Sequence, residues 1–106
     1  MTKILIAEDS TLTQKLIKDI LIKEATFEIV GHAYNGEEVC LMAESLKPDI
    51  ILMDIRMPKM SGLIAIKKIM SENPIPIIVI TSSEPAEEIK VDALKYGAVS
   101  FIFKSK

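Results

Sequence analysis

This sequence of 106 residues has a single cysteine, little net charge and no long apolar run. Cys40 is the single cysteine, which excludes an intrachain disulfide and a cysteine metal cluster and fits a reducing cytoplasm. No apolar run reaches the ~18 residues that a membrane span needs, and the four apolar residues before Glu8 are too few for a secretory signal. The net charge of −2 gives no electrostatic basis for direct nucleic-acid binding.

The length and composition indicate one domain that spans residues 1–106. Apolar residues make up 49% and charged residues 26% of the chain, which is the balance of a folded globular protein rather than a disordered one. We find no internal repeat, low-complexity segment or linker.

Short apolar runs alternate with stretches of helical period along the whole chain. The expected strands cover residues 3–7, 27–33, 49–53, 77–81 and 99–103. Asn35, with Glu38 three residues on, has the spacing of a helix-capping box, Pro48 stops that helix, and Gly97 suits the residue after a helix end. The alternation predicts an α/β fold with an open, mostly parallel sheet.

Polar residues follow four of the expected strands. Glu8 and Asp9 follow the first strand, Asp54 the third, Thr81 and Ser82 close the fourth, and Lys104 follows the fifth. In sheets of this kind, ligands bind beyond the carboxyl ends of the strands. We therefore expect these side chains to share one cleft.

Three carboxylates in one cleft repel one another unless protons or a cation compensate their charge. Several carboxylate oxygens suit a hard divalent ion, and Mg²⁺ commonly takes a few carboxylates together with water and a phosphate oxygen. Zinc is disfavoured, because neither His32 nor Cys40 lies at the carboxyl end of an expected strand.

Asp54 could also act as a nucleophile that forms an aspartyl phosphate. A metal ion would reduce the repulsion between the carboxylate and the phosphoryl donor, while Lys104 and Thr81 could each hold a phosphoryl oxygen. Such a site would suffice for phosphoryl transfer, which depends mainly on positioning and charge stabilisation.

Several motifs together resemble a response-regulator receiver domain of two-component signalling. They are "ED" at 8–9, "MDIRMPKMSG" at 53–62, "TS" at 81–82 and "FIFK" at 101–104. Details such as "NGEE" and "KPDIILMDIRMP" are similar to chemotaxis receivers, both the receiver half of the methylesterase and CheY. The resemblance implies a flavodoxin-like, doubly wound sheet of five parallel strands in the order 2-1-3-4-5.

The resemblance also implies a role for each matching position. Asp54 matches the phosphoacceptor, and Mg²⁺ or Mn²⁺ would be held by Glu8, Asp9, Asp54 and the backbone carbonyl of Arg56. The remaining matches are Thr81 as the switch hydroxyl, Phe101 as the switch aromatic residue and Lys104 as the phosphate-contacting lysine.

A receiver domain would be a signalling switch rather than a conventional enzyme. The resemblance implies a partner histidine kinase, self-catalysed transfer to Asp54, autodephosphorylation, and an output partner or attached output domain controlled through the surface of the fourth helix and fifth strand. One alternative is a pseudo-receiver that binds partners without phosphorylation. Another is a phosphohydrolase with an aspartyl intermediate. Such enzymes use a second acid, as general acid, two residues after the aspartate, and in this chain that position is Arg56.

The chain departs from the family pattern in two places. Ser105 follows Lys104 where proline is usual, and the chain stops at Lys106, where family members continue into a fifth helix. We therefore expect the fifth helix to be missing or truncated here. An uncovered apolar sheet face predicts marginal stability or self-association as a homodimer.

Overall fold

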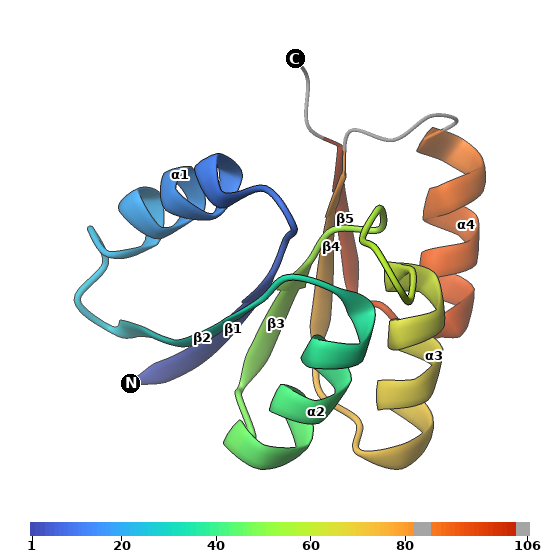
Figure 1. Ribbon diagram of the computed structural model, residues 1–106, viewed down its shortest axis with the longest axis horizontal. Helices are drawn as coiled ribbons and strands as arrows, with labels where there is room; N and C mark the ends of the chain where they lie inside the picture. Colours follow the sequence, from blue (N-terminus) through green and yellow to red (C-terminus); the bar gives the residue numbers. More distant parts are fainter. Residues whose placement is uncertain (82–85, 104–106) are drawn as a thin grey trace.

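The computed structural model describes residues 1–81 and 86–103. It contains a sheet, a helix on one of its faces and three helices on the other (Figure 1). The elements in chain order are β1 (Thr2–Ala7), α1 (Thr11–Leu21), β2 (Phe27–Ala33), α2 (Gly36–Leu46), β3 (Ile50–Met53), α3 (Gly62–Glu72), β4 (Ile77–Thr81), α4 (Ala86–Tyr96) and β5 (Ser100–Phe103).

All five strands pair in parallel, in the order β2-β1-β3-β4-β5. The flavodoxin-like fold expected from the sequence is therefore confirmed, and the expected strands agree with the observed ones to within one residue at each end. The central place of β1 and β3 matters for the site, because the chain leaves both strands at the same edge of the sheet.

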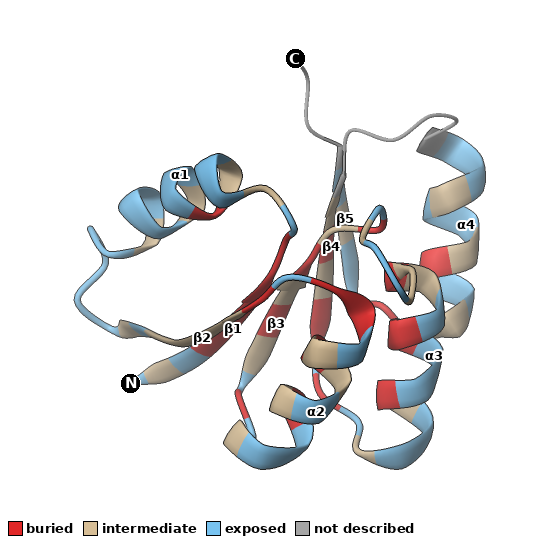
Figure 2. Ribbon diagram, viewed as in Figure 1, coloured by how far each residue is buried: buried red, intermediate tan, exposed pale blue. Residues whose placement is uncertain are grey.

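The main core lies between the sheet and the helices α2, α3 and α4 (Figure 2). Alternate residues of the inner strands point into it, as the twofold period of a strand requires. The strand residues in this core include Leu5, Ala7, Ile51, Met53, Ile77 and Val79, all almost fully buried. Burial on this scale holds the ends of β1 and β3 in fixed positions.

The cap expected at the start of α2 is present. The side chain of Asn35 accepts a hydrogen bond from the backbone N–H of Glu38 at 2.8 Å. The reciprocal bond goes one residue further back than in the usual capping box, because the Glu38 carboxylate accepts from the N–H of Tyr34 at 2.7 Å. Gly97 has a φ of +122°, as expected for the residue that follows a helix.

Helix α1 carries an apolar stripe of leucine and isoleucine residues that is only partly buried. Ile17 and Leu21 are half-buried, whereas Leu12, Leu16 and Ile20 are exposed. Ile102 of β5 is also exposed. The homodimer expected from the sequence stays a prediction. No described helix has the length and apolar character needed to cross a membrane.

His32 on the edge strand β2 gives a prediction for pH dependence. Burial, and secondarily the nearby Lys18 charge, lowers the pKa of His32 below its ordinary value of about 6.5. The unfolded chain therefore takes up a proton at a higher pH than the folded protein does. The stability that neutral His32 provides is present above about pH 6.5 and is lost as the pH falls through the lowered pKa.

We expect the free energy of unfolding to fall as the pH drops below about 6.5, and His32→Gln to flatten that slope. Urea unfolding of both proteins at several pH values measures it. His32 is the single histidine of the chain, so no second imidazole complicates the comparison. Parallel slopes in the two proteins would contradict the assignment.

Candidate functional site

The carboxyl end of β1 carries two acidic residues in different surroundings. The backbone N–H of Glu8 donates to the carbonyl of Ala33 at 2.9 Å, which continues the pairing of β1 with β2 past the last strand residue. The Glu8 side chain is buried, whereas that of Asp9 is exposed. The strand end therefore presents one carboxylate inside the protein and one at its surface.

Asp54 lies beside this pair because β3 is the neighbour of β1. Its backbone N–H donates to the carbonyl of Ala7 at 2.9 Å, so the first residue after β3 is fastened to the last residue of β1. The backbone N–H of Arg56 lies 3.3 Å from the Oδ1 atom of Asp54, and this bond turns the chain away from the strand. The Asp54 carboxylate is thus held at the start of the loop that follows β3.

Close backbone approach explains why glycine stands at the start of α3. The N–H of Gly62 donates to the carbonyl of Ile55 at 2.8 Å. A Cβ atom on Gly62 would lie 2.3 Å from the carbonyl oxygen of Asp54 and 2.8 Å from the Cα atom of Ile55. The loop after β3 can close tightly only without a side chain at this position.

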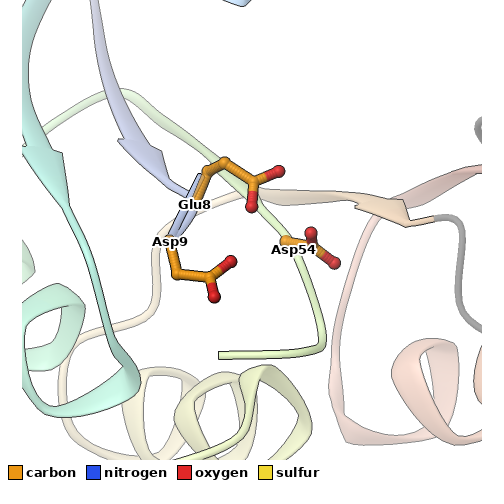
Figure 3. A group of neighbouring side chains, drawn as sticks. All are labelled: Glu8, Asp9 and Asp54. Carbon is orange, nitrogen blue, oxygen red and sulfur yellow. The ribbon is translucent and has the colours of Figure 1, made fainter. Parts of the chain in front are cut away.

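The three carboxylates converge as the sequence predicted. One oxygen from each of Glu8, Asp9 and Asp54 lies within 4.8 Å of the others, and Figure 3 shows the three side chains as neighbours. At 4–5 Å and an effective dielectric constant of ~20, two ionised carboxylates repel by about 3–4 kcal/mol, less where solvent reaches them as at Asp9. The all-oxygen donor set fits a hard divalent cation such as Mg²⁺.

A shallow hollow of about 540 Å³ adjoins the acidic cluster. Its lining comes from Asp9 and from the loop after β3, namely Ile55, Arg56, Met57, Pro58 and Ser61. The side chain of Arg56 is exposed. The cluster is therefore open to the outside on the side of Asp9, whereas Glu8 is buried.

The ends of β4 and β5 lie on the same edge of the sheet. Met53 pairs with Val79, and Thr81 pairs with Phe103, so the last residue of β4 is close in register to the residues that follow β3. The side chain of Thr81 and all of Lys104 lie outside the described part of the structure. Their contacts with a phosphoryl group stay predictions. Phe101 is half-buried against the core.

One residue of this site was missed in the sequence. Gln14 of α1 is buried, and its side-chain amide donates to the backbone carbonyl of Glu8. Its spacing of three and seven residues from Ile17 and Leu21 places it on the half-buried face of the helix. That spacing was the available signal, because it puts a polar residue among positions that pack on the sheet.

A comparison with family models decides the wider identity of the chain. The model of the response regulator receiver domain matches residues 4–106. The chain belongs to this family. The acidic residues of the cluster stand where the sequence resemblance placed them, at the ends of the first and third strands of a receiver domain.

The receiver domain is similar in sequence to proteins named protein-glutamate methylesterase/protein-glutamine glutaminase. The relative from Methanococcoides burtonii is 42% identical over 105 residues, which cover 98% of this chain and 30% of the relative. The relative from Halalkalibacterium halodurans is 39% identical over 103 residues, which cover 96% of this chain and 30% of that protein. This chain therefore spans under a third of their length.

Solved structures agree with this assignment. The response regulator domain of Thermotoga maritima CheB superposes with a TM-score of 0.92 at 39% identity, over 98% of this chain and 78% of that chain. The CheX-CheY-BeF3-Mg+2 complex from Borrelia burgdorferi gives 0.91 at 32% identity, over 99% of this chain and 79% of that one. The resemblance to chemotaxis receivers is confirmed.

Proposed function

We propose that this receiver domain is a phosphorylation-dependent signalling switch whose phosphoacceptor is Asp54. The observation that carries the proposal is the convergence of Glu8, Asp9 and Asp54 within 4.8 Å at the adjoining ends of β1 and β3. Such a cluster would combine a fixed nucleophile with oxygen ligands for a divalent cation, and a donor could approach through the hollow that Asp9 helps to line.

The chemistry needs few groups from the protein. A carboxylate oxygen of Asp54 would bond to phosphorus while the bond between phosphorus and the donor nitrogen or oxygen breaks. A departing imidazole nitrogen takes a proton from solvent, whereas acetyl phosphate releases acetate as the anion. Bound Mg²⁺ or Mn²⁺ would neutralise the negative charge that gathers between the acid and the phosphoryl group. Glu8, Asp9, Asp54 and the carbonyl of Arg56 would hold the ion.

Thr81 and Lys104 complete the proposed site by holding phosphoryl oxygens. Phe101 would move with Thr81, so that the surface formed by α4 and β5 changes between two populations. The half-buried packing of Phe101 against the core suits a side chain with two alternative positions. The same site would later release phosphate by reaction with water, without acting on any other substrate.

A switch of this kind needs a phosphoryl donor and an output. The phosphoryl donor would be a histidine kinase, and the signal would pass to an output domain or protein. Because the relatives are named as methylesterases and this chain spans under a third of their length, an attached methylesterase domain is the proposed output.

The direct test is incubation of the protein with acetyl phosphate. With Mg²⁺ present, intact-mass spectrometry should show a gain of about 80 Da, and excess EDTA should abolish it. No gain in Mg²⁺ or Mn²⁺ would favour the pseudo-receiver alternative. Rapid, repeated release of phosphate from small phosphate esters would favour the phosphohydrolase alternative, against which the arginine at position 56 argues.

A further inference from the structure

The buried side chain of Gln14 contacts the backbone of the acidic site at Glu8. Gln14 is 4% exposed, and only two other polar or charged side chains among the described residues are buried, namely Glu8 and Asn35. Asn35 caps a helix and Glu8 belongs to the acidic cluster. Gln14 thus stands out as a buried polar group that neither role explains.

The amide nitrogen of Gln14 reaches the ends of two strands. It donates to the carbonyl of Glu8 and lies 3.4 Å from the carbonyl oxygen of Ala33. The Ala33 carbonyl also accepts from the N–H of Glu8 at 2.9 Å. One side chain on α1 therefore connects the carboxyl ends of β1 and β2.

The contact with Glu8 affects both acidic residues that follow β1. The carbonyl that Gln14 binds belongs to the peptide group between Glu8 and Asp9, and the orientation of this peptide group sets the direction of the Cα–Cβ bond on either side of it. A buried carbonyl with a fixed partner cannot rotate freely. The two carboxylates thereby keep their directions relative to Asp54.

We propose that Gln14 is a positioning residue that sets the divalent-cation affinity of the acidic site. The inference rests on the proposed function, because it assigns Gln14 a part in assembling the cation site. Partners that orient metal ligands commonly contribute about 10- to 100-fold to metal affinity. Gln14 would bind the peptide group between Glu8 and Asp9 rather than a carboxylate. It would therefore orient these two ligands without moving the nucleophile Asp54.

The test compares Gln14→Met with the unmodified protein. Methionine has similar length and removes the donor group. The Mg²⁺ concentration that gives half-maximal phosphorylation by acetyl phosphate should rise about 10-fold or more. The rate at saturating Mg²⁺ should change much less, because Asp54 keeps its bond to the Ala7 carbonyl. Leu16→Met, on the exposed face of α1, is the matched control.

A lower thermal midpoint with an unchanged half-maximal Mg²⁺ concentration would overturn the proposal, because it is the result of a merely structural role. If Gln14→Met does not fold, NMR of the unmodified protein replaces it. The side-chain NH₂ signals of Gln14 should then shift during Mg²⁺ titration with the same midpoint as the Asp54 amide, and their constancy would overturn the proposal. Failure of the unmodified protein to bind Mg²⁺ would instead refute the proposed function.

Discussion

Asp54→Asn is expected to abolish phosphorylation by acetyl phosphate. The substitution retains the size and hydrogen-bonding shape of the side chain but removes the nucleophilic carboxylate and its charge. The gain of about 80 Da should disappear even at high donor and Mg²⁺ concentration. The fold should persist, because the bond from the Asp54 N–H to the Ala7 carbonyl belongs to the backbone.

Asp49→Asn is the matched control for this experiment. Asp49 directly precedes β3 and Asp54 directly follows it, so the two residues flank the same strand. The Asp49 carboxylate accepts from the N–H of Lys3 at 2.7 Å, a bond that the oxygen of asparagine can also accept. Asp49→Asn should be phosphorylated like the unmodified protein. Phosphorylation that survives Asp54→Asn would place the acceptor elsewhere.

Gly62→Ala is expected to damage both stability and phosphorylation. The new methyl group would lie 2.3 Å from the carbonyl oxygen of Asp54 and 2.8 Å from the Cα atom of Ile55, and both are backbone atoms that cannot simply rotate away. Overpacking of this kind costs about 1–3 kcal/mol. The displaced loop would also move Asp54, and a shift near 1 Å can slow a positioned reaction by about 100-fold.

Gly31→Ala separates this effect from the general consequences of replacing glycine. A Cβ atom at Gly31 would lie 2.7 Å from the terminal methyl of Met42 and 3.0 Å from a methyl of Leu46, which are the ends of flexible side chains. We therefore expect a smaller loss of stability and an unchanged phosphorylation rate. Urea unfolding and initial rates with acetyl phosphate measure both. Equal behaviour of the two variants would contradict the role of the Asp54 backbone contact.

The acidic cluster could be predicted because its signals are local. A run such as "IILM" at 50–53 becomes an interior strand through its apolar character, and the residue after it must then lie at a strand end. Glu8, Asp9 and Asp54 were found in this way. Gln14 was missed. Its spacing along α1 indicates only that it lies on the half-buried face of the helix, whereas its contacts with the carbonyls of Glu8 and Ala33 depend on how closely α1 packs on β1 and β2.

The apolar stripe of α1 shows that helical periodicity does not by itself predict burial. Leu12, Leu16 and Ile20 share a helix face with partly buried residues, yet they are exposed in the described structure. Helical period indicates which side chains lie together, whereas burial depends on what packs against them. Similarly, the sequence alone does not reveal that a side chain at position 62 would collide with the Asp54 backbone.

The amino-acid sequence by itself determined the alternation of strands and helices and the polar residues that follow each strand, since both depend on neighbours along the chain. Only the tertiary structure decided how closely the three carboxylates meet, within 4.8 Å, and that Gln14 of α1 is buried with its amide donating to the backbone carbonyl of Glu8. These features depend on strand order and helix placement, which are set by packing between segments distant in sequence.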